Sequence, residues 1–312
     1  MATVEIPAVL GEVDPRRFRN KRVRIVKGDG FYDVQILEPD MSFAEMLELR
    51  IPVAPSEMRE ARDREYANIG VSATMTTTIE GKDYLVLAPA ITGEMVKLIS
   101  GYVPTENLPF PEKALDTEVS EEFLPWTADG MVVRGGYEDL QLPRPYADVL
   151  VDVPFTFKLE RVSRFTLPGL LEGLVHVEGR VVEGEPFLYF LAGTNSAQLV
   201  FPLHVTFPFG TSDLSFHLAE DYLVREREVL EVRARPYGIR LACLGDLGEL
   251  TGDVYSLREG VLVPEHVEGM VLSEVFGLRG LESRGVTEVK NIPLREYLEL
   301  QRRFRFPSFC VG

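Results

Sequence analysis

The sequence predicts an α+β fold, in which a few helices are scattered among many β-strands. Two observations lead to this prediction: β-type segments dominate residues 147–244, and helix-type patterns interrupt the strands of the first hundred residues. The regular strand–helix alternation of a doubly wound parallel sheet is missing. At 312 residues the chain is long enough for one large domain or two modest ones, either with a substantial core.

The first hundred residues contain the expected helices. Alternating or β-branched runs predict strands, while a proline followed by charges of both signs predicts a helix start. Glu80-Gly81-Lys82-Asp83 is a turn signal between two β-type runs and predicts a hairpin. Strands are expected at residues 4–10, 22–27, 32–37, 71–79 and 84–87, and helices at residues 41–49 and 55–65.

Residues 84–102, YLVLAPAITGEMVKLISGY, are the most informative segment. An apolar strand runs into a proline-marked turn, and apolar residues at helical spacing then predict a helix from Glu94 to Tyr102. Thr92 is the expected N-cap, preceding Gly93. A helix N-terminus leaves backbone N–H groups available, which is a common way to hold phosphate, although a plain helix cap explains the same residues.

The rest of the chain divides by composition. Residues 103–146 are rich in Pro, Glu and Gly, which predicts a loop-dominated insertion with little regular structure. Residues 251–312 are expected to be mixed, with a final amphipathic helix at 294–304. Strands are expected at residues 149–153, 155–165, 173–182, 187–191, 197–207, 214–218, 229–235 and 239–244.

Composition limits the classes of function. The chain carries 33 basic and 49 acidic residues, a net charge of −16, which argues against general affinity for nucleic acid. Basic clusters at 16–24 and 302–305 include aromatic residues and could contact phosphates, or they form a solvated edge strand and a basic helix end. No apolar run is long enough to span a membrane, so a cytoplasmic protein is expected.

No coherent catalytic set is present in the sequence. His204-Val205-Thr206 has the H-x-T form of two-histidine phosphoesterases, but that chemistry needs a second such element and the sequence has one. The two cysteines lie far apart, and zincin, nucleophile-elbow and phosphate-loop motifs are missing. A binding or structural subunit without catalytic residues, metal or cofactor is therefore expected.

Several strings resemble a known family in the same order. The APAITGEMV string within 84–96 resembles the V-P-A-I-S-G-E junction of CRISPR-associated RAMP proteins of the DevR group, and more narrowly the archaeal subtype I-A member that forms the Cascade backbone. The KLERVSRF string at 158–165, after Asp148-Val149, is similar to that family's K-R-T-S-R stretch. LVHV at 174–177 and the run 187–201 match two later strands, so the resemblance covers roughly residues 70–210.

The resemblance implies a modified RRM-like (ferredoxin-like) sheet with large β-rich insertions. Residues 1–102 and 147–250 would form the palm, with 103–146 as an insertion and 251–312 as a C-terminal segment. It implies a non-catalytic subunit that binds guide RNA by its sugar–phosphate backbone. The implied partners are copies of itself in a helical filament and other effector subunits. The implied RNA-binding residues are Thr92, Gly93, Lys97, Lys158, Arg161, Arg164, Arg59 and Arg62.

Other interpretations stay open from the residues alone. Arg161 and Arg164 could form cross-strand ion pairs with residues such as Glu160 instead of binding RNA. A β-rich, acidic chain with few histidines also suits a virion or assembly protein of a thermophilic virus. A β-rich enzyme that acts on a small molecule is the third alternative.

Overall fold

The structure is a computed structural model. It describes residues 7–14, 18–29, 31–49, 64–89, 95–161, 174–182, 187–191, 196–224, 229–246, 248, 250–267, 269–270 and 292–293.

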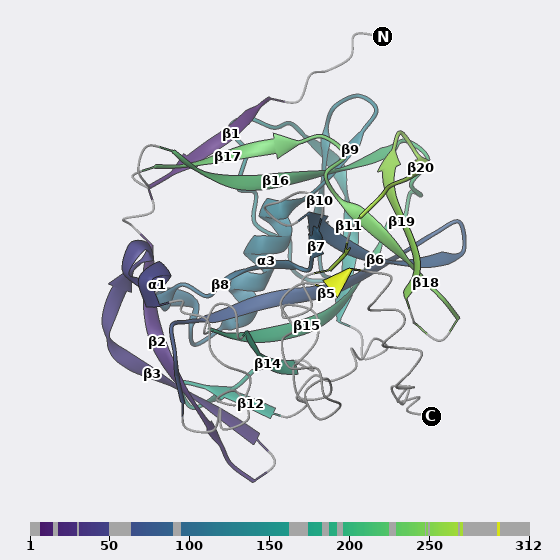
Figure 1. The fold of residues 1–312 in the computed structure, drawn as a ribbon. Coiled ribbons are helices and arrows are strands. Elements are labelled where there is room, and N and C mark those ends of the chain that lie inside the picture. The colour runs from purple at the N-terminus through teal and green to yellow at the C-terminus, as the bar shows by residue number, and fades with distance from the viewer. Residues whose placement is uncertain are drawn as a thin grey trace.

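Two long parallel strands form the centre of the molecule (Figure 1). Strand β5 (Ile69–Ile79) pairs in parallel with β15 (Ser196–Thr206) along most of its length. On the other edge of β5 lie β8 (Ile99–Tyr102) and β6 (Lys82–Pro89), and on the other edge of β15 lie β14 (Phe187–Leu191) and β11 (Asp152–Arg161). We refer to these six strands as the central sheet.

Helix α3 (Pro111–Glu122) lies between the central sheet and a second group of strands (Figure 1). It packs against β5 and β8 on one side and approaches β9 and β16 on the other. The second group consists of β1 (Val9–Val13), β17 (Val229–Arg235), β16 (Leu214–Val224), β9 (Phe123–Thr127) and β10 (Val132–Gly136).

The remaining elements extend these layers. A separate sheet has the order β13 (Arg180–Val181), β12 (Leu174–Val177), β3 (Phe31–Ser42), β2 (Arg19–Lys27) and β4 (Arg64–Tyr66), with α1 (Phe43–Leu49) following β3. Strands β18 (Arg240–Leu244), β19 (Leu250–Arg258) and β20 (Val261–Pro264) continue from β6. The short elements are β7 (Met95–Lys97), η2 (Thr105–Asn107), β21 (Gly269–Met270) and β22 (Ile292–Pro293).

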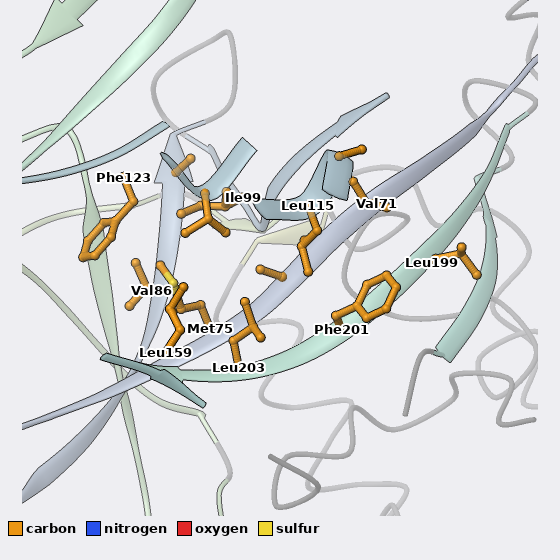
Figure 2. Packing of buried hydrophobic residues seen from close by; sticks show 14 of the residues in the cluster. Val71, Met75, Val86, Ile99, Leu115, Phe123, Leu159, Leu199, Phe201 and Leu203 are labelled. Carbon is orange, nitrogen blue, oxygen red and sulfur yellow. The ribbon is translucent and has the colours of Figure 1, made fainter. Parts of the chain in front are cut away.

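The main core lies between α3 and the central sheet (Figure 2). Every second residue of β5 and β15 points toward the helix, as the pleat of a strand requires. Val71 and Met75 of β5, Leu199 and Leu203 of β15, and Leu115 of α3 are all fully buried in this cluster. Burial of apolar surface at about 25 cal/mol per Å² makes this face the main source of stability.

The hairpin predicted around Glu80 is confirmed. Glu80 and Gly81 are the two turn residues between β5 and β6, and both have positive φ, 51° and 76°. Two successive residues of positive φ are characteristic of a type I′ turn, whose twist matches that of the strands it joins. Most other predicted strands are also confirmed, as is the helix expected at 41–49, which is α1.

The helix predicted from Glu94 to Tyr102 is wrong. The described part of this segment forms β7 and β8 instead: Val96 pairs with Pro89, and Ile99 pairs with Ala73. Buried Val96, Leu98 and Ile99 fit a helix spacing and a pair of short strands equally well. The pairing with β5 and β6, which spacing along the chain cannot reveal, decides between the two.

The prediction that residues 103–146 are loop-dominated is also wrong. They contain η2, the twelve-residue helix α3, β9 and β10. Pro111 occupies the start of α3, where its missing N–H costs nothing and its fixed φ favours the helix. Ala114, Leu115 and Val119 of α3 are buried, so this segment builds the core.

In coarse terms the chain is mostly β-sheet, arranged in mixed sheets with α3 as the principal described helix. The helix expected at 55–65 lies outside the described residues except at its end, where Arg64 and Glu65 belong to strand β4. The final helix expected at 294–304 lies wholly outside them.

Gly70 of β5 is expected to tolerate no side chain. A Cβ at this position would overlap the Gln198 side chain, whose amide donates to the Val71 carbonyl at 2.6 Å and to the Ser72 hydroxyl at 2.7 Å. We expect Gly70→Ala to lower the free energy of unfolding by about 1–3 kcal/mol, as overpacking does. Urea denaturation measures this change, and adding Gln198→Ala should recover part of it. Strictly additive losses in the double variant would contradict this explanation.

Candidate functional site

On the face of the central sheet that points away from α3, β5 and β15 carry a series of polar side chains. On β5 and β15, hydroxyl, amide and imidazole groups alternate with the apolar residues of the core, because successive side chains point to opposite faces. One end of this face is buried: Ser72, Thr74 and Gln198 are at most 6% exposed. The polar residues of the two strands on this face are Ser72, Thr74, Thr76, Thr78, Ser196, Gln198, His204 and Thr206.

The other end of the polar face is open to solvent. Lys158 and Glu160 of β11 are exposed, as is Thr206 of β15, while His204 is half-buried. The strand register places Lys158 opposite Thr206, and Glu160 opposite His204. His204 in turn lies opposite Thr76 of β5. We call these five residues the open polar end.

The imidazole of His204 is held in place by Thr76. The Thr76 hydroxyl lies 3.0 Å from His204 Nδ1 and donates to the Leu203 carbonyl at 3.3 Å. Since a hydroxyl has one hydrogen, it accepts from Nδ1–H when it donates to that carbonyl. This contact holds the ring by its Nδ1 edge.

Within the described part of the chain, the charged groups of the open polar end have no partner. Among the described residues, no hydrogen bond or ion pair involves the Lys158 ammonium or the Glu160 carboxylate. The two residues are two positions apart on one strand, so their side chains leave the sheet on the same face about 7 Å apart. A ligand at this end would meet one cation, one anion, a hydroxyl and an imidazole edge.

A second group of ionisable residues surrounds the C-terminal end of α3. The Lys97 ammonium lies 3.4 Å from Glu122 Oε1 and donates to the Ser100 hydroxyl at 3.3 Å. Glu118 packs against the Cα of Gly101, where a Cβ would overlap its carboxylate. We call Lys97, Glu118, Glu121 and Glu122, together with Asp221 of β16, the carboxylate cluster.

Burial and crowding raise the pKa of the carboxyls in this cluster. Burial is the largest cause for Glu121, whose pKa rises to about 7, and the charges of Asp221 and Glu122 add to it. Burial and the neighbouring carboxylates raise the pKa of Glu118, and burial raises that of Glu122, where Lys97 is the largest opposing cause. Groups with perturbed pKa values often mark functional sites, although buried ionic clusters produce them too.

The structure separates the described residues of the predicted RNA site. Lys158 and Arg161 are three residues apart on β11, so they point to opposite faces of the sheet. Arg161 lies on the α3 side, with its guanidinium 5.9 Å from the Tyr137 ring and 6.0 Å from the Phe201 ring. Lys97 belongs to the carboxylate cluster.

The other predicted RNA-binding residues, Thr92, Gly93, Arg164, Arg59 and Arg62, lie outside the described residues. Thr92 and Gly93 were expected to offer helix amides to a phosphate, but the residues that follow them form β7. The RNA-binding role of all eight residues stays a prediction.

Sequence reasoning did not select two members of the open polar end, Thr76 and Glu160, as candidate binding residues. The H-x-T string did single out His204 and Thr206, which lie on one face of β15. The alternation from Phe155 to Glu160 was visible as well. Only the register between strands shows that Thr76, His204 and Glu160 form one row.

Two further findings concern metal ligands and membrane-spanning helices in the described part of the chain. No group of three or more His, Cys, Asp or Glu side chains among them is arranged to hold a metal ion. None of the helices in the described part is long and apolar enough to cross a membrane. Comparisons of the chain with protein-family models, with curated proteins and with solved structures found no match.

Proposed function

We propose that this chain is a non-catalytic RNA-binding subunit that holds a sugar–phosphate chain on the open polar end of its central sheet. The observation that carries the proposal is the contrast between the two faces of that sheet. One face is covered by α3. The other is buried around Ser72, Thr74 and Gln198, and it opens to solvent only at the end that carries Lys158, Thr206 and the half-buried His204. An RRM-like sheet binds RNA on the face that its helices leave uncovered.

The residues of this end favour contacts to the backbone of RNA over contacts to its bases. RRM sheets stack bases on aromatic side chains, whereas the open polar end carries an ammonium, hydroxyls and an imidazole, together with the carboxylate of Glu160. Such groups bind phosphate oxygens and sugar hydroxyls, which position a nucleic acid without reading its sequence. This matches the mode of binding implied by the resemblance to RAMP proteins.

Within this proposal the chain is the repeated guide-RNA-binding subunit of a Cascade-like CRISPR effector in the cytoplasm. Its partners would be guide RNA, copies of itself and other effector subunits. The finer fold proposed is a modified RRM-like palm. Support comes from the collinear strings within residues 70–210 and from a central sheet with a helix on one face.

Exposed aromatic side chains support self-association. Phe155 of β11 is 42% exposed and Phe209 is 39% exposed, and their ring centroids lie 4.4 Å apart. Val151, just before β11, is 67% exposed. Contacts between copies bury such residues both in an RNA-bound filament and in a virion or assembly protein, the second candidate function.

Purification of the chain from its native cells distinguishes the two candidates. A filament that contains RNA of uniform length supports the RNA-binding subunit. Shells, rings or sheets that contain no RNA support the assembly protein and reject the RNA-binding proposal.

The charge of Lys158 gives a direct test of the binding face. We expect Lys158→Glu to weaken binding of a mixed-sequence single-stranded RNA about tenfold, the effect of losing one charged hydrogen bond. The slope of log affinity against log salt should fall by about one. Filter binding at several salt concentrations measures both quantities.

Lys113→Glu is the matched control for this experiment. Lys113 is exposed on α3, near Phe110 and away from the polar face, and its replacement makes the same change in net charge. RNA affinity should be nearly unchanged in this variant. Equal losses in both variants would mean that only net charge matters, and the face would be wrongly assigned.

A further inference from the structure

We infer that the open polar end selects RNA over DNA because Glu160 accepts a hydrogen bond from a ribose 2′-hydroxyl. This inference rests on the proposed function and names the chemical group that the site would recognise. The structure places an exposed carboxylate, with no hydrogen bond or ion pair among the described residues, beside the one lysine of that end, on the same face of the same strand.

A carboxylate in this position needs a donor from the ligand. An ionised carboxylate can only accept hydrogen bonds, and it repels phosphate oxygens. The backbone of RNA has one donor that DNA lacks, the 2′-hydroxyl. If Lys158 binds a phosphate, the Glu160 side chain, about 7 Å along the strand, lies beside an adjoining sugar.

His204 lies beside Glu160 on this face. Its Nδ1 is engaged by Thr76 at 3.0 Å, which holds the ring in place. Since Glu160 lies directly opposite His204 in the register, the carboxylate and the imidazole adjoin each other. A sugar hydroxyl donates its single hydrogen to the carboxylate, whereas a deoxyribose C2′ leaves the carboxylate without a donor and removes it from water at a cost.

Affinity for matched oligonucleotides tests the inference. The probes are one single-stranded sequence made as RNA, as DNA and as 2′-O-methyl RNA, measured by filter binding with the full-length chain. Wild-type protein should bind RNA about tenfold more tightly than the other two, because the methyl ether and deoxyribose both lack the donor. Equal affinity for RNA and DNA would overturn the inference while leaving the proposed function standing.

Replacement of Glu160 assigns the preference to this residue. In Glu160→Ala the ratio of RNA to DNA affinity should fall to about one, and DNA affinity should rise since the repelling carboxylate is gone. Glu138→Ala, which removes an exposed carboxylate beside Tyr137, should keep the wild-type ratio. Persistence of the RNA preference in Glu160→Ala would overturn the assignment.

The same titrations distinguish a failure of this inference from a failure of the proposed RNA-binding function. If wild-type protein binds none of the three probes, the proposed function fails and the inference fails with it. If a second sequence, titrated as RNA and as DNA in the same way, shows no preference for RNA, the carboxylate contacts a base amino group and the ribose assignment is wrong. Urea denaturation of each variant confirms that the folded state is retained.

Discussion

Replacing Asp152 by alanine is expected to lower the free energy of unfolding by about 3–5 kcal/mol, the cost of removing one partner from a buried ion pair. Asp152 of β11 accepts a hydrogen bond from Arg134 Nε at 2.8 Å, and its other oxygen lies 2.5 Å from Arg144 Nε. Arg134 is only 6% exposed. Without Asp152, the Arg134 guanidinium would remain buried with no counter-charge among the described residues.

The reason for so large an effect is the desolvation of Arg134. Both terminal nitrogens of its guanidinium are buried without a hydrogen-bond partner among the described residues. The ion pair with Asp152 is therefore the main interaction that offsets the cost of removing this guanidinium from water. Removal of one partner from a buried ion pair costs more than replacement of both by apolar groups. The double variant Arg134→Met, Asp152→Leu should therefore be more stable than Asp152→Ala alone.

Urea denaturation of wild type and of these two variants measures this expectation. Asp148→Ala is the control, because Asp148 is an exposed carboxylate on the segment that leads into β11. It should change the free energy of unfolding by less than about 0.5 kcal/mol. An Asp152→Ala protein within about 1 kcal/mol of wild type would show that the buried arginine finds another partner or reaches water.

Local patterns in the sequence predict the parts of this fold that local contacts determine. The β-branched run 71–79, the Glu80-Gly81 turn and the strand that follows form a hairpin whose pairing is set by neighbouring residues. The alternation in 155–160 likewise predicts β11 and its two faces. In these segments the spacing of apolar residues fits a strand and does not fit a helix.

The segments that sequence reasoning misread depend on distant partners. Residues 95–102 have apolar spacing compatible with a helix, but β7 and β8 pair with β6 and β5. In 103–146 the prolines and glutamates suggested a loop, yet Pro111 begins α3 and the helix is stabilised by packing between two layers. A short stretch of sequence does not show which strands it will pair with or which layers will bury it.

The candidate site was predictable only in fragments for the same reason. The H-x-T string gives His204 and Thr206, and the resemblance gives Lys158. That Thr76, His204 and Glu160 form one row follows from two strand pairings, the parallel pairing of β5 with β15 and the antiparallel pairing of β11 with β15. Lys97 was expected to bind phosphate, but the fold brings Glu122 to its ammonium.

The carboxylate cluster is expected to make the stability of the protein fall as pH rises. Burial raises the pKa of Glu121 from 4.5 to about 7 in the folded state. Between these two values the folded state binds more protons than the unfolded state, so the free energy of unfolding decreases with pH. The contribution of Glu121 is fully present below pH 4.5 and is lost as pH rises through about 7.

His217 contributes with the opposite sign. It is buried in β16, its Nδ1 accepts from the Tyr237 N–H at 2.9 Å, and burial lowers its pKa to about 4. Its contribution is present above its unfolded pKa of 6.5 and is lost as pH falls toward 4. The pH profile of wild-type protein alone therefore mixes the two effects, and a comparison of variants is needed.

Glu121→Gln isolates the contribution of the cluster, because His217 is present in both proteins and cancels in the difference. The variant should match wild type near pH 4.5 and exceed its free energy of unfolding by up to about 3 kcal/mol above pH 8. The reason is that glutamine cannot ionise, so it is not repelled by the negative charges of Asp221 and Glu122 as an ionised Glu121 is. Urea denaturation at a series of pH values measures the difference.

Glu138→Gln removes an exposed carboxylate and serves as the control, with a difference from wild type that stays small at every pH. Lys97→Met should act in the direction opposite to Glu121→Gln. It removes the ammonium that lies 3.4 Å from Glu122, so its destabilisation should grow as the carboxyls ionise. Parallel pH profiles for wild type, Glu121→Gln and Lys97→Met would show that these carboxyls ionise in water-like surroundings, and the cluster would then contribute nothing to the pH dependence of folding.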